Sequence, residues 1–489
     1  MNADDQAVGE PERLHPLFLL TGIGGSLRGM AGGYAAIGYL AVSGRSGTAL
    51  LAAAALIAFT ALSLLFYWTR FEFRVGSDEI RIDSGIFSRT HRSIPFDRIQ
   101  DVDISQGPIA RLLGIAKVKF ETGGSSGAGQ DEGVLQAIRL ERAEQLRALV
   151  RAHRPSQGEA VPVSLEQPPV FAMSLRRVLL AGVFNFSLAL FAGLFGATQT
   201  FGDVLGFDPL SRSFWLGLLN AGDPIADYIL AHRVVAGMAG AALLVVIGLA
   251  TGMVRTMLRE YGFRLDRTEV GLRRRRGLLT RTDVTLPARR TQAAIVGTGP
   301  LRDAFGWREL KLQSLASDEG GKGDHVLAPL ARDEEVGTIL TELGWRPLSS
   351  AIEWKRVSSA YVWTLIIGLS PLLLIAAMAT LQIPNYALAI AVLLAVMVVR
   401  WRGWRRTFYA LDDDRLLIRS GWWRRRTVVL PLAKIQSIDL TESFVSRWFG
   451  IAGLGFGVAG GSGFSAHEIP ALPRETARAL RTQLLILEP

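Results

Sequence analysis

The sequence of 489 residues has no cysteine and only six histidines. The lack of cysteine excludes disulfide bonds, thiolate metal sites, thioether-linked haem and cysteine nucleophiles, and it leaves the redox compartment undecided. None of the histidines has a second histidine or a carboxylate at the spacing of a zinc motif such as H-E-x-x-H. We therefore expect no metal site and place all six at the surface or in a membrane interface: His15, His91, His153, His232, His325 and His467.

Charged residues are also scarce. They make up 20% of the chain against 49% hydrophobic residues, and the mean hydropathy is +0.26. This balance argues against disorder and against an ordinary soluble enzyme. The charge that is present is uneven, with 54 Lys and Arg against 44 Asp and Glu and a net charge of +10. Such an excess favours contact with anionic lipid or nucleic acid, or the positive flanks of membrane spans.

Motifs of catalysis are weak or lacking. The chain has no P-loop motif. Residues 123–127 fit G-x-S-x-G, but they stand in a Gly/Ser-rich stretch, which favours a flexible loop over a nucleophile elbow. Residues 455–460 fit G-x-G-x-x-G, but no helix follows, which argues against dinucleotide binding. We predict no catalytic residue, no cofactor, and a protein that is not an enzyme.

Long apolar runs are the strongest signal in the sequence. Crossing a bilayer takes about 20 apolar residues, and five runs suit such spans: 48–67, 178–201, 234–254, 361–381 and 386–399. A sixth run, 29–42, follows Arg28 and an interfacial segment at 15–27, and we predict a short or tilted span there. The runs pair as three hairpins, so buried helices of a soluble protein are the weaker interpretation. The acidic first residues do not fit a signal peptide.

Positive residues near the run ends are unevenly placed. Three lie on one side of the membrane, Arg45, Arg212 and Arg233. Twelve lie on the side of the long polar segments: Arg70, Arg74, Arg176, Arg177, Arg255, Arg259, Lys355, Arg356, Arg400, Arg402, Arg405 and Arg406. By the positive-inside rule, the polar segments and both termini face the cytoplasm of a multi-pass protein in the bacterial inner membrane.

The polar segments 71–153, 260–345 and 405–487 share one register. A glycine, a proline, a cation, a glutamine and a second glycine recur in each: Gly85, Pro95, Arg98, Gln100 and Gly114; Gly277, Pro287, Arg290, Gln292 and Gly306; Gly421, Pro431, Lys434, Gln436 and Gly450. Such a threefold match is an internal repeat. Each copy follows its own hairpin, so the repeated unit is two spans and one domain.

Local patterns within each copy indicate strands. Apolar and polar residues alternate between turn residues, and each copy ends in an amphipathic helix such as 332–343 or 474–484. We predict a small antiparallel sheet closed by a C-terminal helix. The predicted divisions are 1–70 for the N-terminal segment and hairpin 1, 71–153 for domain 1, 154–175 for a linker, 176–259 for hairpin 2, 260–345 for domain 2, 346–360 for a linker, 361–404 for hairpin 3 and 405–489 for domain 3.

The motifs from Gly85 to Ile115 and from Gly421 to Ile451 resemble the signature of bacterial pleckstrin-homology-like (PH-like) domains of the second type. Three such domains interleaved with hairpins, after an early Leu14-His15-Pro16, resemble the YdbT-like membrane proteins. The resemblance covers nearly the whole chain and implies a split barrel of about seven strands plus a helix in each domain, without a settled activity.

The middle copy departs from this signature. Thr291 follows the cation where the other copies have isoleucine. Asp303 stands where the other copies have Arg111 and Arg447, so we expect the role of that arginine to be missing from the middle domain.

Two basic clusters are candidate contact sites for lipid or a protein partner. They are Arg273, Arg274, Arg275 and Arg276, before the turn at Gly277, and Trp422, Trp423, Arg424, Arg425 and Arg426, after the turn at Gly421. Both are predicted on the hairpin between the second and third strands. Arginine binds phosphate in a bidentate manner, and aromatic rings favour the headgroup level. An exposed basic strand without a ligand is the alternative for both clusters.

These features predict a non-catalytic membrane scaffold whose three PH-like domains bind a protein partner or anionic headgroups. The resemblance implies a smaller membrane protein with one PH-like domain as partner and a role in envelope stress or defence. No nucleic acid is expected, because a membrane-tied domain meets lipid first, and a homo-oligomer is left open. The alternative function is a transporter or a lipid-handling channel, which the few polar residues within the spans disfavour.

Overall fold

The computed structural model describes most of the chain. The described residues are 10–19, 21–22, 33, 37, 40, 46–84, 90–122, 133–153, 168–186, 217, 232–314, 324–349, 351–381, 383, 387–459 and 467–486. They belong to two compact units. The first comprises Met1–Leu165, Met173–Phe263 and Arg275–Thr285, and the second comprises Glu166–Ala172, Arg264–Arg274 and Leu286–Pro489.

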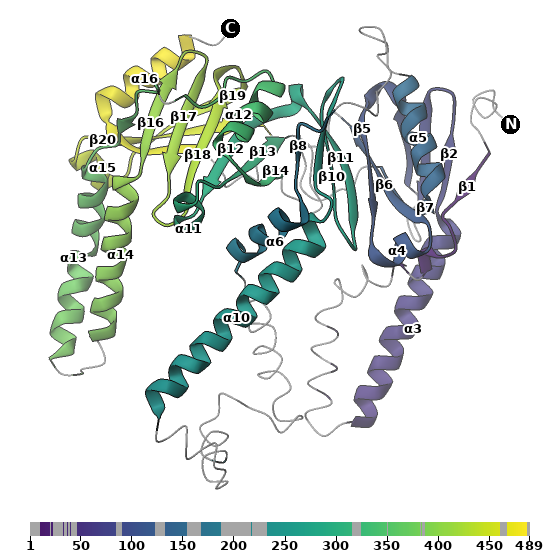
Figure 1. Ribbon diagram of the computed structural model, residues 1–489, viewed down its shortest axis with the longest axis horizontal. Helices are drawn as coiled ribbons and strands as arrows, with labels where there is room; N and C mark the ends of the chain where they lie inside the picture. The colour runs from purple at the N-terminus through teal and green to yellow at the C-terminus, as the bar shows by residue number, and fades with distance from the viewer. Residues whose placement is uncertain are drawn as a thin grey trace. The chain divides into compact units, whose positions relative to one another are not determined.

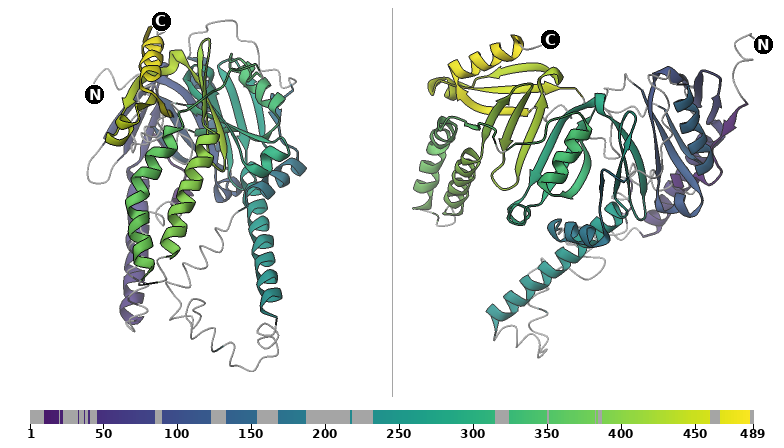
Figure 2. Two further views of the ribbon diagram at one scale, coloured as in Figure 1. Left: turned by 90° about the vertical axis from the view of Figure 1, so that its left-hand side faces the viewer. Right: turned by 45° about the horizontal axis from the view of Figure 1, so that its top comes forward.

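Four of the described helices are long and apolar enough to cross a membrane. They are α3 (Ser46–Arg70), α10 (Arg233–Glu260), α13 (Ala360–Thr380) and α14 (Ala387–Arg405). Their apolar side chains are largely exposed, as a lipid-facing surface requires. In the second unit, α13 and α14 lie side by side, as Figures 1 and 2 both show. Most of the predicted span 29–42 and most of 178–201 lie outside the described residues, and α6 (Leu175–Phe184) covers the start of the latter.

Each polar segment folds with the same order of elements. The first domain has β2 (Glu72–Val75), β3 (Glu79–Ser84), β4 (Thr90–Pro95), η2 (Phe96–Arg98), β5 (Ile99–Gln106), α4 (Pro108–Leu112), β6 (Ile115–Thr122), β7 (Val134–Arg139) and α5 (Leu140–Ala152). The middle domain has β9 (Arg264–Thr268), β10 (Gly271–Arg276), β11 (Arg281–Pro287), η3 (Ala288–Arg290), β12 (Thr291–Thr298), α11 (Pro300–Ala304), β13 (Arg308–Ser314), β14 (Asp324–Ala331) and α12 (Asp333–Glu342).

The third domain repeats this order once more. It has β16 (Phe408–Asp412), β17 (Arg415–Ser420), β18 (Arg425–Pro431), η5 (Leu432–Lys434), β19 (Ile435–Thr441), α15 (Phe444–Trp448), β20 (Ile451–Val458), β21 (His467–Pro473) and α16 (Arg474–Ile486). The recurring proline of the signature ends the third main strand of each copy and begins a short 3-10 turn, because proline fixes φ and lacks the N–H that the strand would continue to use.

Each copy also has a two-residue strand that sequence reasoning missed. These strands are β1 (Glu12–Arg13), β8 (Phe171–Ala172) and β15 (Lys355–Arg356), and they precede α3, α6 and α13. Each pairs antiparallel with the first main strand of its domain, β2, β9 or β16. Each repeated unit therefore begins with a short strand, continues through its apolar membrane segment and then returns to the same sheet.

The cores explain why the strands and the last helix belong together. In the first domain, alternate residues such as Ile80 and Ile82 of β3 are buried with Val118 and Phe120 of β6 and Leu146 of α5. Since neighbouring side chains of a strand point to opposite faces, this alternation presents one apolar face to the core.

The core of the third domain repeats the arrangement. Leu416 and Ile418 of β17 are buried with Phe456 of β20 and with three residues of α16: Ala477, Leu480 and Leu484. In Figure 1, α16 lies along the sheet of its own domain.

The sheets join neighbouring domains rather than ending within them. The strand orders are β1-β2-β3-β4, β7-β6-β5-β11-β10-β9-β8, β14-β13-β12-β18-β17-β16-β15 and β19-β20-β21. β5 of the first domain pairs with β11, opposing Gln106 to Arg281, and β12 of the middle domain pairs with β18, opposing Thr298 to Arg425. By the repeat numbering, Gln106 is equivalent to Thr298 and Arg281 to Arg425. Both junctions therefore use one register.

The turn between β17 and β18 requires glycine. Gly421 has φ +117°, and a Cβ built on it would lie 1.9 Å from the backbone oxygen of Arg424. Gly277 of the middle domain is in the same situation, with φ +112° and 1.8 Å to the Thr280 oxygen. A side chain at either position forces the turn to rearrange.

Gly421→Ala should lower the stability of the third domain by about 1–3 kcal/mol, because the turn must leave its present conformation. The measurement is hydrogen exchange of β17 and β18 in the full-length chain, together with its melting temperature. Gly455→Ala is the matched control, since a Cβ there would meet Asp439 at an ordinary 3.8 Å. Equal exchange in the two variants would show that the turn accepts a side chain.

Candidate interaction surfaces

The basic run of the middle domain is not a surface cluster. Residues Arg273 to Arg276 are the last four of β10, and their burial alternates along the strand. Arg274 is fully buried and its Nη1 donates to the Val326 oxygen at 3.0 Å. Arg276 is also buried, whereas Arg273 and Arg275 are half-buried. The expectation of lipid or partner contact is therefore wrong for Arg274 and Arg276, because strand alternation turns them into the domain.

Arg276 has a buried partner that only the middle copy provides. Its Nη1 lies 2.9 and 3.1 Å from the two carboxylate oxygens of Glu260, which is also buried. The repeat numbering aligns Glu260 with Trp68 and Trp404, and Arg276 with Ser84 and Ser420. The two middle-copy residues thus differ from the other copies as a pair, and each supplies the charge that the other needs in a buried position.

The tryptophans at the equivalent positions lie near the ends of two long apolar helices. Trp68 Nε1 donates to the Leu14 oxygen at 2.9 Å, and Trp404 Nε1 donates to the Val357 oxygen at 3.1 Å. Leu14 and Val357 directly follow β1 and β15. In the first and third copies, the indole therefore ties the end of the long apolar helix to the start of the repeat unit.

The turn of the third domain is an exposed basic and aromatic surface. Trp422 and Trp423 are 46% and 57% exposed, and their rings are 5.9 Å apart. Arg424 and Arg426 are exposed as well. We call these four side chains the third-domain hairpin surface. The middle-domain run precedes its turn glycine, whereas this surface follows the turn glycine, in the turn itself and at the start of β18.

This surface lies beside the end of an apolar helix. Arg406, just after α14, donates from Nη1 to the Trp422 oxygen at 3.2 Å, and a Cβ on Gly403 would be 3.8 Å from the Trp422 Cβ. Near the same helix end, the Arg405 guanidinium lies 5.0 Å from the Trp401 ring centroid. If α14 crosses a bilayer, these aromatic rings and guanidinium groups meet the headgroup level.

Arg425 has a different partner. Its Nη2 lies 2.7 Å from Asp303 Oδ1, which also accepts from Arg308 Nη1 at 2.7 Å. Burial, followed by the nearby charges of Arg425 and Arg308, lowers the pKa of Arg419, while Asp303 opposes this effect. Asp303 is therefore a negative group shared by Arg308 and Arg425 at the β12–β18 junction.

The position of Asp303 serves the junction in two copies. The equivalent Arg111 donates from Nη1 to the oxygen of Leu278, in the turn of the following domain. Asp303 likewise contacts the third-domain hairpin through Arg425. Because a carboxylate cannot donate to a carbonyl oxygen, Asp303 does not repeat the contact that Arg111 makes, and it joins the next domain through the side chain of Arg425 instead.

Two histidines expected at the surface are buried. His325 of β14 and His467 of β21 occupy equivalent positions before the last helix of their domains, and both are less than 5% exposed. His467 Nε2 lies 2.7 Å from Gln313 Oε1. Burial, with a smaller contribution from Arg426, lowers the pKa of His467 to about 4. Its ring therefore stays neutral in the folded chain at neutral pH.

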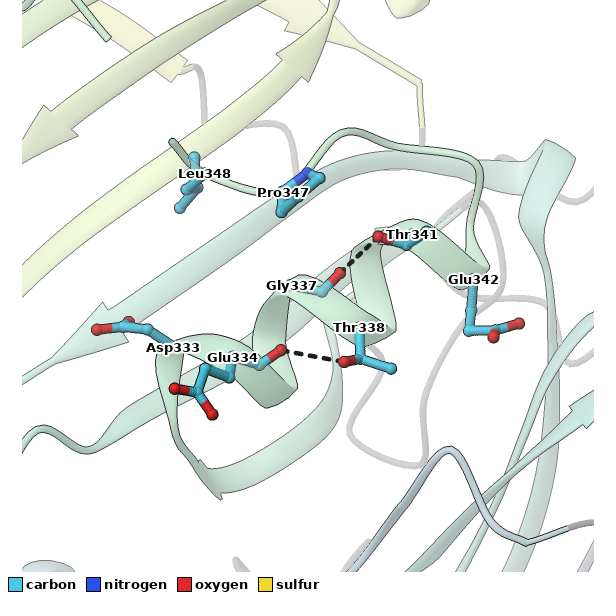
Figure 3. Close-up of a pocket in the computed structure, with 8 residues that line it drawn as sticks. All are labelled: Asp333, Glu334, Gly337, Thr338, Thr341, Glu342, Pro347 and Leu348. Carbon is cyan, nitrogen blue, oxygen red and sulfur yellow. Dashed lines mark hydrogen bonds between the residues drawn. The ribbon is translucent and has the colours of Figure 1, made fainter. Parts of the chain in front are cut away.

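One hollow of the described surface, of about 550 Å³, lies over α12 and is lined by Asp333, Glu334, Glu342, Pro347 and Leu348 among others. Figure 3 shows the hydroxyls of Thr338 and Thr341 turned to the helix itself, and they donate to the Glu334 and Gly337 oxygens at 3.1 and 2.9 Å. No group of three or more potential metal ligands occurs among the described residues. The G-x-S-x-G segment at 123–127 lies outside the described residues.

The other residues of the repeat signature lie in turns, at a domain junction, in the core or at the surface. Gly114, Gly306 and Gly450 end the short helices α4, α11 and α15 with φ from +61° to +69°. Lys434 Nζ donates to the Arg289 oxygen at 3.0 Å, at the β12–β18 junction. Arg290 and Gln292 of the middle copy are buried, whereas Arg98 and Gln436 are exposed. Gly85 and the side chain of Gln100 lie outside the described part.

Comparison with known proteins agrees with this repeat. The bacterial PH domain family matches residues 19–154, 214–344 and 365–487. The chain is 22% identical over 404 residues to UPF0699 transmembrane protein YdbT of Bacillus subtilis (strain 168), covering 78% of both proteins. It is 36% identical over 75 residues to UPF0699 transmembrane protein YdbS of the same organism, covering 15% of this chain and 43% of the relative. No solved structure matches.

Proposed function

Because the chain belongs to the bacterial PH domain family, and because its apolar helices make it a multi-pass membrane protein, we propose that it is a non-catalytic scaffold that holds PH-like domains against anionic headgroups. The observation that carries the proposal is the third-domain hairpin surface, which sets two exposed tryptophans and two exposed arginines beside the end of α14. Each domain is a split barrel in this proposal, and all three face the cytoplasm, as the positive residues near the span ends favour.

Anionic lipid suits this surface better than a neutral ligand. Trp422 and Trp423 present rings that partition to the interface, and Arg424 and Arg426 present guanidinium groups that bind phosphate oxygens. Arg425 is not part of the contact, since Asp303 engages it. A transporter function has less support. Asn185, one of the few polar residues within the predicted spans, donates to Thr256 at 3.2 Å and so joins the end of α6 to α10.

Loss of Arg424 and Arg426 should release the hairpin from an anionic membrane. Each basic residue near such a surface contributes about 1 kcal/mol, so the double variant Arg424→Ser/Arg426→Ser should weaken the contact roughly thirtyfold at low salt. Since the chain has no cysteine, Trp423→Cys offers a single thiol for an environment-sensitive dye. The measurement is the shielding of this dye from an aqueous quencher in nanodiscs with phosphatidylglycerol or with phosphatidylcholine alone.

The control variant is Arg478→Ser/Arg481→Ser, which removes two exposed arginines of α16 and the same net charge. Shielding should need phosphatidylglycerol, fall with added salt, survive in the control and be lost in the Arg424/Arg426 variant. Equal shielding in both lipids, or in both double variants, would refute headgroup binding by this surface.

A further inference from the structure

At the two junctions between domains, a sheet edge of one domain pairs with a strand of the next. The equivalent edges at the two ends of the series, β19 and β4, have no such partner among the described strands. β5 and β12 each pair with the third main strand of the next domain. Their equivalent in the third domain is β19, which pairs on one side with β20 and has no second neighbour among the described strands. The equivalent of β11 and β18 in the first domain is β4, which pairs with β3 and has no second described neighbour.

Burial shows what the missing neighbour would cover. In β12, Ala294 and Val296 are buried beside β18, whereas the equivalent Ile438 and Leu440 of β19 are partly exposed. In β11, Thr282 and Thr285 are buried, whereas the equivalent Thr90 and Ser93 of β4 are exposed. A long edge strand that is neither paired nor shielded invites the addition of a further strand.

We propose that β19 of one chain pairs antiparallel with β4 of a second copy, so that a first domain follows a third domain as the internal domains follow one another. The contact is heterologous, with different surfaces on the two copies, and it continues from chain to chain. It is independent of headgroup binding, because the hairpin surface and the β19 edge are different parts of the third domain.

The register is fixed by the internal junctions. Moving the β12–β18 register to these strands places Thr441 opposite Thr90, Leu440 opposite His91, Asp439 opposite Arg92, and Ile438 opposite Ser93. Directly opposed residues of an antiparallel pair share a face, so Asp439 and Arg92 form an attractive pair and the two threonines a favourable one. Asp439 is exposed and Arg92 partly exposed in the single chain.

Charge and membrane attachment both favour a second copy of the chain as the occupant of the β19 edge. A second copy carries the required edge with a positive residue at the position that faces Asp439. Its first domain is also attached to membrane helices through β1 and β2, as the third domain is through β15 and β16. The short helix α15 strengthens the match, since exposed Arg447 occupies the position at which Arg111 and Asp303 contact the turn of the next domain.

Cross-linking tests the register directly. Thr90→Cys and Thr441→Cys are made in separate full-length chains, each with a single thiol, and mixed in nanodiscs or detergent. Opposed residues in an antiparallel pair have Cα atoms about 4.5–5.5 Å apart, within disulfide range. We expect a disulfide-linked dimer in the mixture and none in either chain alone. Ser437→Cys replaces Thr441→Cys as the register control and lies about 13 Å out of register, so it should not cross-link.

Charge exchange tests the pair energetically. Asp439→Arg and Arg92→Asp each place like charges opposite one another and should each raise the dissociation constant of the full-length chain on the order of tenfold, as measured by sedimentation. The double variant in one chain restores opposite charges with the signs reversed and should associate like the parent.

Other results would overturn the proposal. A chain that stays monomeric at micromolar concentration, or Ser437→Cys cross-linking as well as Thr441→Cys, would do so. Intramolecular cross-linking of a chain that carries both Thr90→Cys and Thr441→Cys would show that the two edges meet within one copy. Cross-linking of Thr441→Cys in native membranes to a different protein, and not to a second copy, would assign the edge to a partner with another PH-like domain.

Discussion

Arg276→Ser should destabilise the middle domain by about 3–5 kcal/mol, because it leaves Glu260 as an uncompensated charge in a buried position. The effect should be seen as a lower melting temperature of the full-length chain in nanodiscs and as faster hydrogen exchange in β10. Arg281→Ser removes the same charge from an exposed position nearby and should change stability by no more than about 0.5 kcal/mol.

The rescue variant gives this prediction its specificity. Glu260→Trp combined with Arg276→Ser gives the middle copy the Trp and Ser of the other copies, and its indole N–H would find the oxygen of Met173, which follows β8 as Leu14 follows β1. We expect the double variant to recover most of the lost stability. If Arg276→Ser alone melts like the parent, the buried ion pair does not hold β10 to the end of α10.

Acidification should weaken the third domain through His467. Its pKa is near 4 in the folded chain, against about 6.5 in an unfolded one. Between these values the unfolded chain binds the proton and the folded chain does not, so stability falls as the pH drops from about 6.5 to 4. Above pH 6.5 this contribution is complete, and the total loss is about 3 kcal/mol.

The measurement is the melting temperature of the parent and of His467→Leu from pH 7.5 to 4.5, since other groups titrate in both chains. The variant should lose stability at pH 7.5, because Gln313 loses its partner, but it should fall less steeply with acid. Parallel curves for the parent and His467→Leu would show that folding does not lower the pKa of this imidazole.

The sequence predicts most of the architecture because the determining signals are local. Period-two alternation predicts the antiparallel strands of each copy, and amphipathic spacing predicts α12 and α16. The turn glycines at 277 and 421 follow from local backbone geometry in the same way. The apolar runs predict the four described long helices from length and hydropathy.

The features that sequence reasoning missed depend on distant residues. A run of four arginines looks like a surface until strand alternation is combined with the position of Glu260 at the end of another element. The signal was present, because Trp68 and Trp404 align with Glu260 while Ser84 and Ser420 align with Arg276. The two-residue strands β1 and β8 are too short for periodicity to show, and the β12–β18 pairing joins residues more than 120 positions apart.

The short strands before the membrane segments have a mechanical consequence. In the third copy, β15 leads into α13 and β16 follows α14, and these two strands pair with one another, while Trp404 bonds to Val357 across the same site. If a single flexible linker joined the domain to its helices, the helices could change their tilt without rotating the domain. Here the segment before α13 and the segment after α14 are both strands of one sheet, so the orientation of the helix pair is coupled to that of the domain. Any change of helix tilt that follows a change of bilayer thickness must rotate the attached domain by a similar angle.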